Sequence, residues 1–259
     1  MKIASFNING IKARLPALLT WLEETRPDIV VLQELKSLDE NFPDEPIRDL
    51  GYNVETHGQK SFNGVAILSR FPLEDVRRGL PGDDDDEQSR WIEALVMGDG
   101  EPIRVCGLYL PNGNPAPGPK FDYKLAWMER LAARARDLLA AEEPAVMAGD
   151  YNVIPQAGDC HDPKAWEDDA LFLPESRAAF HRLLYLGLTD ALRSVTDAEG
   201  IYTFWDYQGN AWPRNKGIRI DHILMTPQAA DRLEDCGIDM HVRDREKPSD
   251  HVPIWVEMR

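Results

Sequence analysis

The chain has 259 residues, a net charge of −16 and three widely separated cysteines. This length is sufficient for one large α/β core, and the composition excludes a disordered, fibrous or disulfide-stabilised protein. The apolar runs are too short to span a membrane, and the N-terminus has the pattern of a strand and not of a signal peptide. We therefore expect one cytoplasmic domain, 1–259, that is a monomer and does not bind membranes.

The acidic charge, from 45 acidic and 29 basic residues, taken alone argues against a nucleic-acid partner, because phosphate binding usually needs a basic surface. Two alternatives remain. A local basic patch could bind a polyanion while the acids face elsewhere, or some acids could bind a metal ion that supplies positive charge. Five consecutive acids, Asp83–Glu87, are expected to form a solvated, mobile loop.

Apolar periodicity predicts a series of strands with helices inserted at intervals. In chain order the elements are a strand at 3–8, a helix at 16–25, strands at 29–32, 51–54, 65–68, 89–96 and 103–110, a helix at 121–141, a strand at 145–148, a helix at 174–185, and strands at 218–225 and 252–257. A single parallel sheet would need a helix between most strand pairs, and this chain has too few. The order predicts two sheets packed face to face with helices outside.

Polar side chains stand at the ends of most of these strands, next to apolar residues. Burying such groups costs free energy unless they are paired or bind a metal. Each group alone has an ordinary structural explanation, such as a turn or a helix cap, but so many together indicate one site assembled by the fold. The residues are Asn7, Asn9, Glu34, Tyr109, Asp150, Asn152, Asp221, His222, Asp250 and His251.

The types of these side chains indicate which metal such a site would hold. Glu34, Asp150 and Asp250 offer carboxylates, and Asn7 and Asn152 offer amide oxygens. The cysteines are distant in sequence, and the histidines are too few and scattered for a zinc site. Hard oxygen ligands suit Mg²⁺ or Mn²⁺, which bind one or two carboxylates together with water and substrate phosphate. This pattern indicates phosphate chemistry.

Five segments resemble, in order and spacing, the endonuclease/exonuclease/phosphatase superfamily. They are SFNING at 5–10, LQE at 32–34, GDYN at 149–152, RIDH at 219–222 and PSDH at 248–251. Four further segments, 57–60, 77–79, 204–207 and 246–251, resemble the exonuclease III family of abasic-site endonucleases, and the likeness extends over residues 1–259. Two departures are Leu35, where the family commonly has threonine, and the order Phe204-Trp205, which rearranges an aromatic pair.

The resemblance implies a four-layered α/β sandwich with the site at one edge of the two sheets. It also implies a metal-dependent DNA-repair nuclease. Such an enzyme hydrolyses the phosphodiester 5′ to an abasic site and acts on duplex DNA as a 3′→5′ exonuclease, 3′-phosphatase and 3′-phosphodiesterase. The alternatives are a superfamily phosphoesterase acting on a small phosphate or lipid, and a binding module that has lost catalysis. The expected acids, amides and histidine are all present, which argues against the last alternative.

Carried over position by position, the resemblance implies a role for each catalytic residue. Asp150 would deprotonate the attacking water, and Asn152 would hold that water or a phosphate oxygen. Tyr109 would contact the phosphate or the leaving group, and Asp221 would orient His251. His251 could act as a base or donate a hydrogen bond to the phosphate, and its acidic neighbours favour the donor role. One-metal and two-metal schemes remain open; the expected metal ligands are Asn7, Glu34, Asp150, Asn152, Asp250 and His251.

DNA contacts are expected from basic residues near aromatic ones, because this combination suits a flipped or missing base. Lys120 and Lys124 open the long predicted helix, whose N-terminus also favours phosphate. Packing in the core is an equally good explanation for Trp205 and Trp212, and a solvated helix end is an alternative for the lysines. The expected DNA-binding residues are Arg90, Lys120, Lys124, Trp205, Trp212, Arg214, Asn215 and Arg219.

Overall fold

The computed structural model describes residues 1–98 and 100–259, in which twelve strands form two six-stranded sheets. The first sheet has the strand order β11-β12-β1-β2-β4-β3. Its strands are β1 (Lys2–Asn7), β2 (Ile29–Gln33), β3 (Asn53–His57), β4 (Val65–Ser69), β11 (Leu233–Ile238) and β12 (Ile254–Met258).

The second sheet repeats this arrangement with the order β5-β6-β7-β8-β10-β9. In each sheet one central parallel pair, β1 with β2 or β7 with β8, is flanked by antiparallel strands. The strands are β5 (Leu73–Arg78), β6 (Trp91–Val96), β7 (Ile103–Tyr109), β8 (Ala145–Asp150), β9 (Thr189–Asp190) and β10 (Asp221–Met225).

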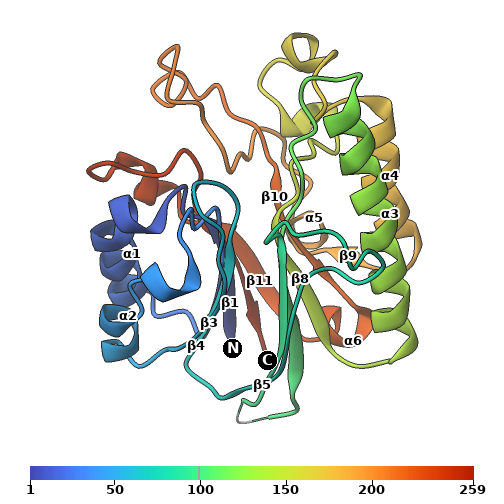
Figure 1. The fold of residues 1–259 in the computed structure, drawn as a ribbon. Helices are drawn as coiled ribbons and strands as arrows, with labels where there is room; N and C mark the ends of the chain where they lie inside the picture. The colour runs from blue at the N-terminus through green and yellow to red at the C-terminus, as the bar shows by residue number, and fades with distance from the viewer. Residues whose placement is uncertain (99) are drawn as a thin grey trace.

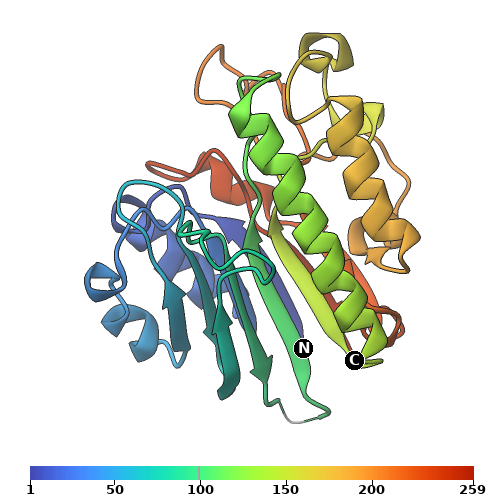
Figure 2. The same cartoon turned by 45° about the vertical axis from the view of Figure 1, so that its right-hand side comes forward.

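The helices α1 to α4 lie on the outer faces of the two sheets, as Figures 1 and 2 show, whereas α5 and α6 contribute Ala191 and Ala229 to the buried cluster between the sheets. The helix α1 connects β1 to β2 and α3 connects β7 to β8, because a parallel pair needs a long crossover. No helix in the described ranges is long and apolar enough to cross a membrane. The helices are α1 (Ile11–Thr25), α2 (Glu45–Asp49), α3 (Pro119–Ala140), α4 (Pro174–Tyr185), α5 (Ala191–Val195) and α6 (Pro227–Ala230).

Side chains alternate between the two faces of each strand, and this alternation produces the layers of the sandwich. Ile3 and Val31 of the first sheet belong to the same buried cluster as Val105 of the second, so this cluster lies between the sheets. Phe6 on the opposite face of β1 packs instead in a cluster with Leu18 of α1. Successive strand residues point to opposite faces, so each sheet is covered on both sides. The predicted four-layered sandwich is confirmed.

The structure adds three strands that the apolar pattern did not predict, β5, β9 and β11. All three lie at the edges of their sheets; β9 is only two residues long, and Glu74 and Asp75 of β5 are exposed. Edge strands carry charges that discourage pairing with other chains, so they lack an apolar signal. The helix α1 also begins five residues before the predicted start at Pro16, because the buried Ile11 anchors an earlier turn.

The acidic run Asp83–Glu87 is not wholly solvated as predicted. Asp86 accepts hydrogen bonds from the hydroxyl of Tyr123 (3.0 Å) and from the guanidinium of Arg130 (2.8 Å), both on α3. Burial raises the pKa of Asp86, but the hydrogen bonds with Arg130, Gln88 and Tyr123 together outweigh burial. The pKa of Asp86 is therefore below its ordinary value. One residue of the run therefore attaches the loop to α3.

Arg219 was expected on a DNA-binding surface, and this prediction was wrong. Its side chain is fully buried just before β10 and lies 2.7 Å from Asp159 and 2.9 Å from Asp190. Burial raises the pKa of Asp159, but hydrogen bonds and charges from Arg219 and Arg193 outweigh burial and lower it. The guanidinium is therefore a structural counterion for two interior carboxylates.

We expect Arg219→Met to lower the free energy of unfolding by about 3–5 kcal/mol, because it removes the buried counterion of Asp190 and one of the two counterions of Asp159. Because the folded-state pKa of Asp159 is depressed, its stabilisation is full above about pH 4 and is lost as the pH falls through the folded-state value. The difference between wild type and Asp159→Asn should therefore shrink on acidification. Urea unfolding at pH 7 and at lower pH measures both effects.

Arg182→Met provides the matched control, because Arg182 forms an exposed ion pair with Glu129 on the surfaces of α4 and α3. Exposed ion pairs contribute about 0–1 kcal/mol. A loss for Arg219→Met as small as that of the control would contradict a structural role for the buried cluster.

Candidate active site

The carboxyl ends of the two parallel strand pairs meet at one edge of the sandwich. Asn7 ends β1 and Glu34 follows β2, while Tyr109 ends β7 and Asp150 ends β8. The sheets are joined here by hydrogen bonds from Asn7 Nδ2 to Asp150 Oδ2 and from the Tyr109 hydroxyl to Glu34 Oε1, each 2.9 Å. Residues 143 and 75 positions apart are therefore in contact, as the polar strand ends predicted.

Two further strands bring an imidazole to the same edge. Asp221 begins β10 and is paired with Asp150 in the antiparallel register, and His251 comes just before β12. His251 Nδ1 lies 2.8 Å from Asp221 Oδ2, and its Nε2 lies 3.7 Å from Asp150 Oδ2. The Ser249 hydroxyl donates to the carbonyl of Asn7 at 2.7 Å, which attaches the SDH segment to the end of β1.

Glu34 is surrounded by donors on both carboxylate oxygens. Oε1 accepts from Asn7 Nδ2 (2.9 Å) and from the Tyr109 hydroxyl, and Oε2 lies 2.9 Å from Lys36 Nζ. Burial raises the pKa of Glu34, but the Asn7 hydrogen bond and the charges of Lys36 and His251 outweigh it and lower the pKa. Glu34 therefore stays ionised at neutral pH.

Asp150 and Asp221 form a buried pair of like charges that share one imidazole. Burial first, and then the charge of Asp221, raise the pKa of Asp150. Burial lowers the pKa of His251, but the charge and hydrogen bond of Asp221 outweigh it and raise the pKa. Asp221 Oδ1 is buried and has no hydrogen-bond partner among the described residues. The pair therefore favours positive charge at His251.

The donor set fits a hard divalent cation. Ligand atoms of Glu34, Asp150 and His251 all lie within 4.8 Å of one another, with the two carboxylates as the hard donors. Asn7 bonds to both carboxylates through Nδ2, which leaves its Oδ1 to accept from the backbone N–H of Asn9 (3.0 Å). Asp250 stands apart from this cluster, where its Oδ1 accepts from Asn9 Nδ2 at 2.9 Å.

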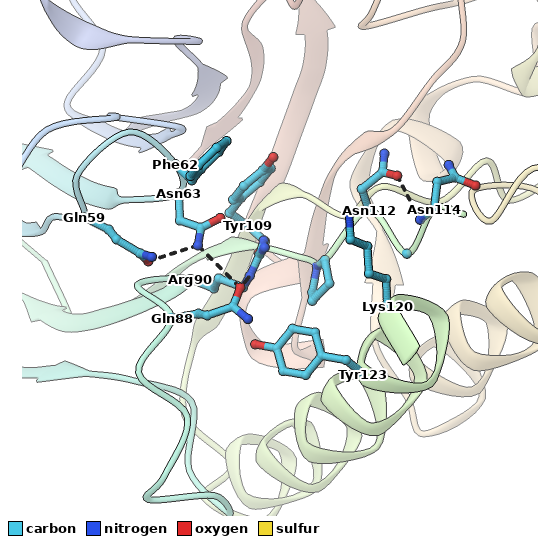
Figure 3. A pocket seen from close by; sticks show the side chains of 12 residues that line it. Gln59, Phe62, Asn63, Gln88, Arg90, Tyr109, Asn112, Asn114, Lys120 and Tyr123 are labelled. Atoms are coloured by element: carbon cyan, nitrogen blue, oxygen red, sulfur yellow. Dashed lines mark hydrogen bonds between the residues drawn. The ribbon is translucent and has the colours of Figure 1, made fainter. Parts of the chain in front are cut away.

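Two cavities open at this edge. A cavity of about 260 Å³ contains Glu34, Asp150 and His251 and has an apolar wall that includes Phe204 and Leu171. An adjoining cavity of about 460 Å³ shares Tyr109, Asn112 and Asn114 with the first. Figure 3 shows its walls, with Phe62 and Asn63 on one side and Lys120 and Tyr123 of α3 on the other.

The structure separates the predicted DNA-binding residues into two groups. Lys120, Arg214 and Asn215 are exposed, and Arg90 and Trp212 are half-buried. Arg90 lies over the Tyr109 ring, 4.9 Å from its centroid, and donates to the Tyr109 carbonyl at 3.2 Å. These five lie where a ligand can reach them, with Arg90 and Lys120 in the wall of the larger cavity.

Lys124 and Trp205 are fully buried, so their prediction as DNA contacts was wrong. The Lys124 ammonium donates to three backbone carbonyls, and burial lowers its pKa, against the charges of Asp169 and Asp150. Trp205 packs edge-on against Trp212 and donates to Asn215 Oδ1 at 3.1 Å. Helix position and aromatic composition do not report which face is buried.

Sequence reasoning missed four residues of the cavities and their surroundings. Lys36 could have been found from its position two residues after Glu34, and Asn112 from its position two residues after the predicted strand 103–110. Nothing in the local pattern marks Asn114, or Phe62, whose side chain is 70% exposed beside the larger cavity.

Two sheets that join at a cluster of carboxylate, amide and imidazole groups beside an open cavity define a hydrolase-type site with a candidate metal centre. Residues 4–251 match the Endonuclease/Exonuclease/phosphatase family. The chain is 38% identical to exodeoxyribonuclease III of Haemophilus influenzae, with all of both chains covered. It therefore belongs to the exonuclease III/AP endonuclease family of that superfamily, which confirms the family predicted from its motifs.

Solved structures agree with this assignment. An AP endonuclease from Archaeoglobus fulgidus is 40% identical, with a TM-score of 0.94 over 100% of this chain and 99% of that one. The 3′ phosphatase NExo from Neisseria, bound to a product DNA hairpin, is also 40% identical, with a TM-score of 0.96 and the same coverage.

Proposed function

We propose that this protein hydrolyses the phosphodiester 5′ to abasic sites in duplex DNA and removes nucleotides, phosphates and phosphodiesters from 3′ ends. The observation that carries the proposal is the convergence of Glu34, Asp150 and His251 beside an open cavity. Full-length relatives named exodeoxyribonuclease III, AP endonuclease and 3′ phosphatase support the same activities. The protein is accordingly a nuclease of the exodeoxyribonuclease III type.

The shape of the larger cavity favours a DNA strand over a small phosphate or lipid. The cavity is open, contiguous with the candidate metal site, and lined by Arg90, Lys120 and the exposed Phe62. Cationic groups beside an exposed aromatic ring suit a phosphate backbone and its bases. Arg214, Asn215 and Trp212 lie on the loop that follows Phe204 of the smaller cavity and would extend this contact.

Mg²⁺ or Mn²⁺ is the metal that best suits the donor set. Glu34 would be the principal ligand, with Asp150 beside it, and Asn7, Asn152 and Asp250 are further candidate ligands. His251 would join them only as a neutral imidazole, because a protonated imidazole has no lone pair for a metal. When bound, the cation would neutralise charge on the phosphate and on the leaving 3′-oxygen.

The imidazole of His251 has the charge and orientation of a hydrogen-bond donor. Asp221 accepts from Nδ1, so Nε2 points toward Asp150 and the smaller cavity. Because Asp221 raises the pKa of His251, Nε2 carries a proton at neutral pH. His251 would donate that hydrogen bond to a non-bridging phosphate oxygen, which stabilises the charge that develops during hydrolysis.

Asp150 is the base that this geometry favours. Burial and Asp221 raise its pKa, which brings a carboxylate closer to the basicity needed to accept a proton from water. The backbone N–H of Asn152 donates to Asp150 Oδ1 at 2.9 Å, which holds the carboxylate in one orientation. The side chain of Asn152 follows in the same turn and would hold the attacking water or a phosphate oxygen.

The hydroxyl of Tyr109 would act as a neutral donor. Burial first, and then the charges of Glu34 and Asp150, raise its pKa well above the ordinary value. The phenol therefore keeps its proton at neutral pH. It donates to Glu34 in this structure and would contact the phosphate or the leaving group when substrate binds.

A duplex with one abasic analogue tests the proposed function. We expect metal-dependent incision 5′ to the analogue, no incision in EDTA, and a loss of about 10²-fold or more in kcat for His251→Asn. An undamaged duplex and a small phosphomonoester are the control substrates. Absence of incision by wild type with Mg²⁺ or Mn²⁺, together with cleavage of the small substrate, would favour the alternative phosphoesterase.

Metal binding is expected to stabilise the folded protein in the absence of DNA. A cation at about 100 times its Kd adds about 2.7 kcal/mol, so MgCl₂ or MnCl₂ should raise the Tm of wild type. Glu34→Gln removes the principal anionic donor and should abolish this increase, whereas Glu129→Gln on the exposed face of α3 should retain it. An undiminished increase in Glu34→Gln would remove Glu34 from the metal site.

A further inference from the structure

Lys124 carries a charge into the protein interior beside the site, yet the mechanism above does not use it. Its side chain is fully buried in the first turns of α3. Nζ lies 3.0 Å from the carbonyl of Asn112, 2.6 Å from that of Asn152 and 3.2 Å from that of Ala170. Asn112 lies in the connection between β7 and α3, and Asn152 and Ala170 lie at two distant points of the connection between β8 and α4, so a single ammonium joins three segments behind the site.

Burial lowers the pKa of Lys124 to about 7, so the charged form is costly at this position. Among the described residues, Asp169 and Asp150 act on Lys124 through charge alone, without a hydrogen bond. Three carbonyl acceptors match the three N–H donors of an ammonium, and a buried charge without a contacting counterion costs several kcal/mol. A methionine would fill the same volume without that cost, so packing alone does not account for a lysine.

Asn152 is the residue that the ammonium constrains most closely. Its backbone is in the left-handed region, with φ of 47°, which costs free energy for a residue other than glycine. Its side-chain Nδ2 donates to the Leu110 carbonyl at 2.9 Å, and its backbone N–H donates to Asp150. Lys124 completes this set by holding the Asn152 carbonyl, so the strained turn has every polar group bonded.

The Lys124 ammonium also holds Asn112. Lys124 bonds its carbonyl, and the Asn112 Nδ2 donates to Asn152 Oδ1 at 3.3 Å, so the two asparagines are joined through both backbone and side chain. Asn112 lines both cavities, and Asn152 lines the smaller one. A displacement of the ammonium would therefore move two amide side chains that line the cavities of the site.

Gly113 shows that the loop is shaped around the lysine stem. Its φ is +91°, and a Cβ there would lie 2.6 Å from Lys124 Cδ. Both the left-handed backbone and the close approach require glycine. Replacement of Gly113 would thus displace Lys124 while leaving its charge in place.

We propose that Lys124 is a positioning residue for the hydrolysis, in which its buried ammonium orients Asn112 and Asn152 toward the scissile phosphate without touching DNA. This inference rests on the proposed function. Lys124 could act in three ways, through DNA contact, through stability or through active-site geometry. These roles would change the DNA affinity, the Tm and kcat, respectively.

Steady-state incision of the abasic duplex by Lys124→Met tests the inference. We expect kcat to fall about 10- to 100-fold, with KM and the DNA affinity in EDTA within about threefold of wild type, and with an unchanged salt dependence of binding. A phosphate contact would instead weaken binding and reduce the salt slope by about 1, and that result would overturn the positioning role. An unchanged kcat, measured below the Tm of the variant, would also overturn it.

Ser176→Ala is the matched control, because the buried Ser176 hydroxyl donates to the Ala170 carbonyl at 2.6 Å but contacts neither asparagine. Its kcat should stay at the wild-type value. Should Lys124→Met fail to fold, Gly113→Ala decides, since a similar loss of kcat supports the inference and an unchanged kcat overturns it. Failure of wild type to incise the duplex overturns the proposed function and this inference together.

Discussion

The burial of Asp150 and Asp221 at paired positions of β8 and β10 is the constraint on which the site depends. Two adjacent carboxylates in the interior repel each other and lose hydration. His251 between them, with Asn7 and Asn152 as donors to Asp150, offsets that cost. The same arrangement raises the pKa of Asp150 and of His251. The burial that destabilises the carboxylate pair is thus the feature on which the proposed base and donor roles depend.

The topology of the two sheets brings the polar strand ends together at one edge of the sandwich. Each sheet contains one parallel pair, and the carboxyl ends of both pairs lie at the same edge, where Asn7, Glu34, Tyr109 and Asp150 come within hydrogen-bonding distance. The crossover helices α1 and α3 make the parallel pairs possible. The start of α3 also carries Lys124, so one helix serves the fold and the loops of the site.

Charge is distributed unevenly between the surface and the interior. The chain is strongly acidic overall, yet Lys124 and Arg219 are fully buried among carbonyl and carboxylate groups. Lys120, four residues from Lys124, is exposed in the wall of the larger cavity. Composition reports the total charge but not which cations reach solvent, and for that reason the sequence placed the buried Lys124 and Arg219 among the expected DNA contacts.

Sequence patterns alone determined the layers, the central strands and the identity of the polar groups at their ends. Strand alternation and strand-end chemistry are local properties, so they are visible without tertiary contacts. The edge strands β5 and β11 were missed because charged edges lack an apolar period, and β9 because two residues are too short to show one. Tertiary structure alone decided that Lys124, Trp205 and Arg219 are interior, that Lys36 bonds Glu34, and that Asn112 reaches Asn152. These outcomes depend on which faces pack together, and packing is set by contacts between residues far apart in the chain.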